Sequence, residues 1–276
     1  MIKAHKTPPY RLLACDLDGT LMGDDTTVHP PVRRALAKAQ ARGVYVTLAT
    51  GRSFLATLPF ARSLDISLPL ICHQGGCVKH PLNGELFYQA TMERSLVLQV
   101  VKLARAHDWH MVIYLGDDVY LSEFRHPLSL YHDMLGTNLH RVDNLAGIVD
   151  KNGQDPSKFI LVADKAQADR IEARLSARFD RHMVIVRSHD FFVEGNPLGV
   201  SKGNALHRLA AHLDVPQAQV MAIGDQDNDV TMIAWAGLGV AMGGGSQAVQ
   251  AAADWVAPPL SAHGAVAAIE RFLLMD

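Results

Sequence analysis

The sequence lacks several features that would place it in a common class at once. Its 276 residues contain no internal repeat and no low-complexity linker. No apolar run approaches the ~20 residues of a membrane-spanning helix. The formal net charge is only −2, so the overall charge gives no reason to expect a nucleic acid or a membrane as partner. Hydrophobic residues make up 49% and charged residues 20%, which is typical of a globular protein with a sizeable core.

Cysteine is also scarce. The three cysteines are an odd number, and their spacing fits neither a disulfide framework nor a zinc site. Reduced thiols are therefore expected. The basic start, MIKAHKTPPYR, leads into an apolar stretch, Leu12 to Cys15, that is far too short for a secretory signal. We therefore expect a cytoplasmic protein.

The first and last parts of the chain alternate between strand-like and helix-like segments. Short apolar segments predict strands, and segments with helical periodicity or helix-start residues lie between them. The strands are expected at 11–15, 44–50, 68–76, 220–225 and 238–245, and the helices between them at 30–43, 53–64, 201–213 and 229–237. This rhythm predicts an α/β fold with a Rossmann-like parallel-sheet core and helices on both faces.

The middle of the chain differs from these parts in its predicted secondary structure. Residues 110–124 contain two β-type runs around Gly116-Asp117-Asp118, which predicts a hairpin. A further strand, an amphipathic helix and a second strand pair follow at 158–195. We therefore expect an inserted α+β domain at 83–195, between the core segments 1–82 and 196–276.

Polar residues follow three of the predicted core strands. Asp16 and Asp18 come directly after the first strand, Thr50-Gly51-Arg52 after the second, and Gly224 to Asp229 after a later one. In an open α/β sheet, ligands bind beyond the carboxyl ends of the strands. Residues at i and i+2 of an extended chain point to the same side, so Asp16 and Asp18 can face one site.

A cluster of Asp16, Asp18 and Asp225 requires a proton or a cation. At ~4 Å and an effective dielectric of ~20, each ionised pair repels by about 4 kcal/mol. Oxygen ligands select a hard ion, and Mg²⁺ is the expected one. Thr50, Lys202 and backbone amides near Gly51 supply donors for an anion. A metal, an anion site and a carboxylate nucleophile together indicate phosphoryl transfer.

Four motifs in this order resemble the haloacid dehalogenase superfamily of phosphatases. They are DLDGT at 16–20, TGR at 50–52, Lys202 in GVSKGNAL, and GDQDND at 224–229. The long insertion between the second and third motifs resembles the type-two cap of the Cof-like branch. That branch consists mostly of phosphatases acting on sugar phosphates and other small phosphometabolites.

The resemblance implies a role for each matching residue. Asp16 would be the nucleophile that forms an aspartyl-phosphate, and Asp18 would be the general acid and base. Asp229 would support the metal shell or Lys202, and the segment Leu21–Val28 would couple substrate entry to cap closure. The implied phosphate-binding residues are Leu17, Thr50, Gly51, Lys202 and Asn228. The implied Mg²⁺ ligands are Asp16, Asp18 through its backbone carbonyl, Asp225 and Asp229.

Several residues are interpreted as structural or leave alternatives open. Cys15 is expected to point into the core and not to act as a nucleophile, and Asp227 is expected to be solvated. The Asp117-Asp118 pair is interpreted as a hairpin turn. The alternative is that the pair lies in a cap loop that takes part in substrate choice. Many relatives carry Asn-Gly after the third strand, where this chain has Gln74-Gly75.

The expected function is a Mg²⁺-dependent phosphatase, a phosphoric monoester hydrolase. Its expected partner is a small phosphorylated metabolite, with no nucleic acid and no membrane. A phosphomutase and a phosphometabolite sensor remain as alternatives. The sequence indicates neither the physiological substrate nor the oligomeric state.

Overall fold

The computed structural model describes residues 9–125, 128–135, 138–189 and 191–275. Residues 1–8, which form most of the basic start considered above, lie outside this range. By their contacts, the residues form two compact units. Unit 1 comprises the described residues of Met1–Thr50, Thr57–Phe87 and Ser201–Asp276, and unit 2 comprises Gly51–Ala56 and Tyr88–Val200. Along the described chain, no helix is both long enough and apolar enough to cross a bilayer.

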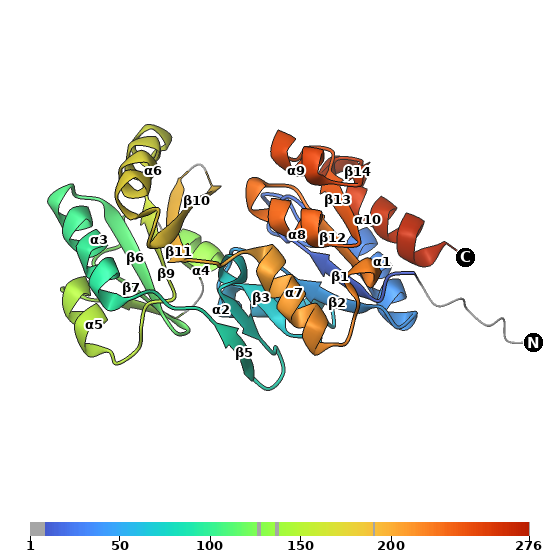
Figure 1. Ribbon diagram of the computed structural model, residues 1–276, viewed down its shortest axis with the longest axis horizontal. Helices are drawn as coiled ribbons and strands as arrows, with labels where there is room; N and C mark the ends of the chain where they lie inside the picture. Colours follow the sequence, from blue (N-terminus) through green and yellow to red (C-terminus); the bar gives the residue numbers. More distant parts are fainter. Residues whose placement is uncertain (1–8, 126–127, 136–137, 190, 276) are drawn as a thin grey trace, which may run out of the picture. The chain divides into compact units, whose positions relative to one another are not determined.

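Unit 1 is built on a parallel five-stranded sheet in the order β14-β13-β12-β1-β2 (Figure 1). Its three central strands, β13, β12 and β1, are continuous buried apolar runs, as expected where helices cover both faces of a sheet. The strands are β1 (Leu12–Cys15), β2 (Tyr45–Leu48), β12 (Val220–Gly224), β13 (Leu238–Met242) and β14 (Trp255–Ala257).

The helices of unit 1 fall into two groups around this sheet. Helices α1 and α10 pack against each other, and α8 packs against both α7 and α9. Two prolines open α1, and Ser201 caps α7 by accepting a hydrogen bond from the amide of Asn204. The bounds are α1 (Pro30–Ala41), α2 (Phe54–Ser63, of which 54–56 belong to unit 2), α7 (Lys202–His212), α8 (Val230–Trp235), α9 (Gln247–Ala252), α10 (Gly264–Ile269) and a final π-helical turn (Glu270–Leu274).

The third predicted core strand departs from the expected parallel sheet. It shares only an isolated parallel bridge, Ala49 with Ile71, with the segment after β2. Its main partner is antiparallel, in a three-stranded sheet in the order β3-β4-β5. The strands are β3 (Leu70–Cys72), β4 (Cys77–Lys79) and β5 (Leu86–Gln89).

Unit 2 contains a six-stranded sheet in the order β10-β11-β9-β6-β7-β8. The β6–β7 pair is the predicted hairpin, and its turn places Gly116 at φ 62°. Asp117 therefore lies in a hairpin turn, which is the first of the two interpretations given for the Asp117-Asp118 pair. The strands are β6 (His110–Leu115), β7 (Asp118–Leu121), β8 (Leu139–Arg141), β9 (Lys158–Val162), β10 (Met183–His189) and β11 (Phe192–Pro197).

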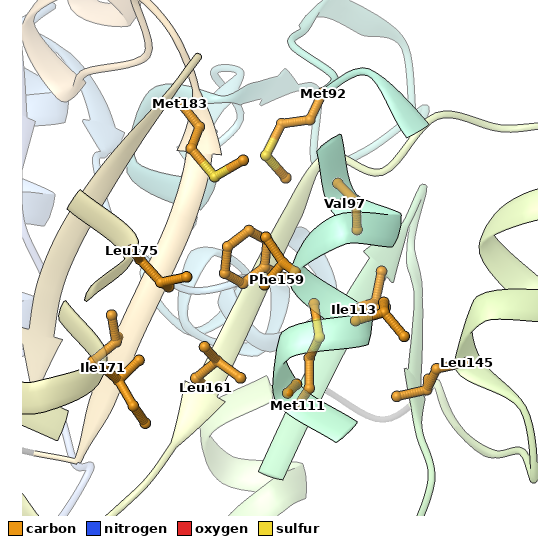
Figure 2. Packing of buried hydrophobic residues seen from close by; sticks show 14 of the residues in the cluster. Met92, Val97, Met111, Ile113, Leu145, Phe159, Leu161, Ile171, Leu175 and Met183 are labelled. Carbon is orange, nitrogen blue, oxygen red and sulfur yellow. The ribbon is translucent and has the colours of Figure 1, made fainter. Parts of the chain in front are cut away.

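Side-chain alternation along these strands gives unit 2 two apolar layers. Alternate residues such as Ile113, Phe159 and Leu161 pack under α3, α5 and α6 (Figure 2). The residues between them, such as Ile160, face the opposite layer with Tyr131 of α4. The helices are α3 (Arg94–Ala106), α4 (Leu128–Leu135), α5 (Leu145–Lys151) and α6 (Lys165–Phe179). The observed fold thus confirms the predicted α/β core with an α+β insertion.

Candidate active site

The DLDGT segment turns sharply where β1 ends. Asp16 continues the strand, because its amide donates to the carbonyl of Ile223 at 2.9 Å, and the residue is 5% exposed. Asp18 is exposed to solvent. Leu17 is buried, and its carbonyl accepts from the amides of Leu21 and Met22 at 2.9 and 3.0 Å. The turn therefore buries the first carboxylate and leaves the second in contact with water.

Gly19 allows this turn to approach the GDQDND loop. Its φ is +83°, and a Cβ atom there would lie 2.2 Å from Oδ2 of Asp225. Thr20 then donates from Oγ1 to Oδ1 of Asp225 at 2.9 Å, across 205 positions of sequence. Glycine at this position is required by both the left-handed backbone and the close carboxylate. No role was predicted from the sequence for Thr20, the threonine of DLDGT. Its hydrogen bond fixes the position of the Asp225 carboxylate.

Lys202 lies at the centre of the site. Its side chain is 1% exposed, and its Nζ donates to Oδ1 of Asp16 at 2.7 Å and to Oδ1 of Asp229 at 2.6 Å. Lys202 is the first residue of α7, directly after the cap Ser201. One ammonium group thus joins the first and fourth motifs through the third.

Asp229 is occupied by protein donors on both of its oxygens. While Oδ1 accepts from Lys202, Oδ2 accepts from the backbone amides of Asp225 and Gln226 at 2.9 and 3.0 Å. Of the two roles implied for Asp229, these contacts favour the support of Lys202. Gln226, unassigned from the sequence, donates from Nε2 to Oδ2 of Asp225 at 2.9 Å.

The electrostatics of the cluster follow from its surplus of acids. Burial raises the pKa of Asp16 well above its usual range, Lys202 opposes this rise, and Asp229, Asp225 and Asp18 add to it. Burial and the charge of Asp229 raise the pKa of Asp225 to about 6, against hydrogen bonds from Thr20 and Gln226. Burial alone would lower the pKa of Lys202, but Asp16 and Asp229 outweigh it and raise that pKa.

The cluster also fits a divalent cation. One carboxylate oxygen from each of Asp16, Asp225 and Asp229 lies within 4.8 Å of the others, and all three residues are buried. Three acids face a single lysine, so a bound cation would relieve the charge imbalance. Oxygen donors alone suit a hard ion such as Mg²⁺. The side chain of Asp18, which is exposed, is not part of this group.

The remaining predicted site residues lie on neighbouring segments. Thr50 is buried at the end of β2, and its carbonyl accepts from the amide of Gln74 at 3.1 Å. Asn228 donates from Nδ2 to Oε1 of Gln74 at 2.9 Å. Gly51 belongs by its contacts to unit 2, where its carbonyl accepts from Nζ of Lys158 at 3.0 Å.

Two residues that the sequence marked as structural have the expected positions. Cys15 is fully buried, and burial followed by the charge of Asp16 raises the pKa of its thiol. A buried thiol of raised pKa is a poor nucleophile. Asp227 is exposed and accepts from Oγ of Ser246.

Fold and site together define an α/β enzyme with a buried, carboxylate-rich centre at the carboxyl ends of its parallel strands. Residues 13–269 match the family of haloacid dehalogenase-like hydrolases. The chain belongs to this family, which confirms the resemblance found in its motifs, and it is an enzyme of the phosphatase class.

Individual relatives cover nearly the whole chain. It is 30% identical over 273 residues to the putative phosphatase YxeH of Bacillus subtilis, covering 96% of this chain and 99% of that one. It is 28% identical over 260 residues to the 5-amino-6-(5-phospho-D-ribitylamino)uracil phosphatase YitU of the same organism, covering 90% and 92%. A solved haloacid dehalogenase-like hydrolase from Bacteroides thetaiotaomicron superposes with a TM-score of 0.84 at 26% identity, covering 95% and 99%.

Proposed function

We propose that this protein is a Mg²⁺-dependent phosphatase that hydrolyses small phosphorylated metabolites through an aspartyl-phosphate. The observation that carries the proposal is the buried Asp16, held by Lys202 in a cluster where three carboxylates share one ammonium group. Such an arrangement fixes a nucleophile next to a site that attracts a cation, which is what phosphoryl transfer needs.

In the first step, an oxygen of Asp16 attacks phosphorus and the bond to the leaving alcohol breaks. Asp18 donates a proton to that alcohol. In the second step, Asp18 takes a proton from water, the water oxygen attacks phosphorus, and the bond to Asp16 breaks. The solvent exposure of Asp18 supports this role, because the general base of the second step must contact the attacking water.

Cation and phosphate binding are assigned from the same contacts. Asp16, the backbone carbonyl of Asp18, and Asp225 would hold Mg²⁺, with Asp229 holding Lys202 and completing the surroundings of the metal. When bound, Mg²⁺ would offset the charge of the phosphoryl oxygens. Leu17, Thr50, Gly51, Lys202 and Asn228 would bind the phosphoryl group.

The proposal also covers the domains and the setting of the enzyme. Residues 1–82 and 196–276 would form the catalytic core, and residues 83–195 the inserted cap. Cys15, Cys72 and Cys77 are buried and form no disulfide, which supports a cytoplasmic location. The name of YitU describes a phosphatase of a small phosphorylated metabolite, which supports the same broad substrate class here.

The test measures phosphate release from a panel of phosphometabolites with and without Mg²⁺. The blank is Asp16→Asn, and the matched control is Asp214→Asn, which removes an exposed acid outside the site. We expect release that requires Mg²⁺, is absent in Asp16→Asn and is retained in Asp214→Asn. Substantial release by a folded Asp16→Asn would overturn the mechanism. Transfer of the phosphoryl group to a second hydroxyl, with little free phosphate, would instead identify a phosphomutase.

A further inference from the structure

Two amide side chains at the edge of the acid cluster leave hydrogen-bonding atoms unused. Asn228 donates from Nδ2 to Oε1 of Gln74, and Gln74 is only 4% exposed. Among the residues that the structure describes, Nε2 of Gln74 and Oδ1 of Asn228 have no hydrogen-bond partner, although both atoms are buried. Buried polar atoms are almost always paired, so a donor and an acceptor that the protein leaves unpaired mark a place where a bound group could be recognised.

The backbone at Gln74 is held in an unfavourable conformation. His73 and Gln74 have φ values of 51° and 58°, in the left-handed region that costs a residue with a side chain about 1–2 kcal/mol. Strain of this kind gathers at functional sites. The turn is therefore a candidate for a functional constraint on the position of the Gln74 side chain.

Neighbouring contacts fix this turn between the motif segments. The amide of Gln74 donates to the carbonyl of Thr50 at 3.1 Å. At Gly75, a Cβ atom would lie 2.2 Å from the carbonyl oxygen of Ser201, directly before Lys202. Asn228 precedes Asp229, which holds Lys202. The amide pair therefore connects the segments proposed to bind the phosphoryl group.

The chemistry of the unpaired atoms selects their ligand. A phosphate dianion only accepts hydrogen bonds, so it would satisfy the Nε2 donor and leave the Oδ1 acceptor unpaired. A hydroxyl or an amide accepts one hydrogen bond and donates another, which matches both atoms. Reversing both amide groups exchanges the two roles and still leaves one donor and one acceptor.

We propose that Nε2 of Gln74 and Oδ1 of Asn228 bind the organic part of the substrate through a hydroxyl or amide group close to the phosphate ester, which leaves the second hydrogen on Nδ2 of Asn228 for the phosphoryl group. This inference rests on the proposed phosphatase function. It gives Gln74 a role in discriminating phosphate monoesters that carry such a group from those that do not.

The experiment compares two phosphate esters with the same carbon chain. Erythritol 4-phosphate carries hydroxyls, and n-butyl phosphate carries none. Gln74→Met removes the amide and keeps the length of the side chain. We expect it to lower kcat/KM for erythritol phosphate about tenfold, the effect of losing one or two hydrogen bonds, and to change kcat/KM for butyl phosphate less than about threefold.

Controls separate this role from a structural one. Gln247→Met makes the same change on an exposed residue of α9 and should leave both substrates unaffected. Gln74→Asn provides a second variant, because asparagine tolerates the left-handed backbone while its shorter side chain cannot reach as far. It should lose the same preference for erythritol phosphate, and thermal unfolding confirms that each variant is folded.

The outcomes distinguish failure of this inference from failure of the proposed phosphatase function. Equal losses on both esters would show that Gln74 only positions the site, and no loss on either would show that it does not contact substrate. Either result overturns the inference. If the wild type with Mg²⁺ releases phosphate from neither ester nor from any phosphometabolite, the proposed function itself fails.

Discussion

Two lysines are fully buried in the described chain, and their surroundings differ in charge. Lys202 in unit 1 lies within 2.7 Å of carboxylate oxygens of Asp16 and Asp229, and Asp225 completes the same acidic group. Lys158 in unit 2 meets one carboxylate, Oε2 of Glu194, at 2.8 Å. The first lysine is outnumbered by acids, whereas the second forms an ion pair with one carboxylate among the described residues.

This difference separates a chemical site from a structural one. A balanced buried pair satisfies itself and needs no further ion. An unbalanced cluster is stable only when a proton or a cation compensates it, and it therefore binds what its chemistry requires. Burial of a lysine is common to both units, so charge balance is what distinguishes the proposed catalytic cluster of unit 1 from the buried pair of unit 2.

The largest expected effect is on catalysis. Lys202→Met should lower kcat by about 10²–10³, because a preorganised cation no longer holds Asp16 or offsets the charge developing on the phosphoryl group. The measurement is steady-state phosphate release, with Lys165→Met as a control that removes an exposed lysine of α6. Retention of more than about a tenth of the activity would contradict the role of Lys202.

Next in size is the loss of stability when either lysine is removed alone. Lys202→Met and Lys158→Met should each cost about 3–5 kcal/mol, because a buried carboxylate loses its counter-charge. Thermal unfolding with added Mg²⁺ distinguishes the two variants. The cation should restore part of the stability of Lys202→Met and none of that of Lys158→Met. Equal rescue of both variants would show that the charge imbalance is not specific to unit 1.

The acid cluster should also make metal-free stability depend on pH. The pKa of Asp225 rises from 3.8 to about 6 on folding, so the folded protein binds more protons than the unfolded chain between these values. Stability therefore falls as pH rises through this window, by up to about 3 kcal/mol from Asp225. The raised pKa of Asp16 acts in the same direction.

Urea unfolding between pH 4 and pH 7 in the presence of a chelator measures this slope. Asp225→Asn should reduce it, and saturating Mg²⁺ should flatten or reverse it, because the metal binds the ionised acids. A metal-free protein whose stability rises with pH across this window would show that the acids are compensated without a cation.

The smallest effect is expected from replacing the balanced pair as a whole. The double variant Lys158→Met with Glu194→Leu should lie within about 2 kcal/mol of the wild type, because no uncompensated charge is left buried. Urea unfolding of the two single variants and the double variant gives the coupling free energy. A double variant as unstable as Lys158→Met alone would mean that the pair is worth more than its charge balance.

Much of the fold could be predicted because the core strands are continuous apolar runs that end in polar residues. The runs before Asp16 and Asp225 became β1 and β12, which are parallel neighbours in the sheet. The β3–β4 hairpin was not predicted, because its strands are three residues long. Its turn places His73 and Gln74 in left-handed conformations that are usually associated with glycine or asparagine.

The candidate site was also predictable only in part. Motif order predicted Asp16, Lys202 and Asp225 as parts of one site, and the structure brings Asp16 together with each of the other two. The supporting contacts were not predictable: Thr20 with Asp225, and Gln74 with Asn228, join residues 205 and 154 positions apart. No local pattern encodes which side chains meet across such distances.

By itself, the sequence determined the alternation of buried strands and amphipathic helices and the residue types at the strand ends, because these follow from local periodicity and composition. Only the tertiary structure decided that three carboxylates share one lysine in unit 1 while a single glutamate balances the lysine of unit 2. Charge balance depends on which side chains are brought together and removed from water, and that is settled when the strands pack into sheets.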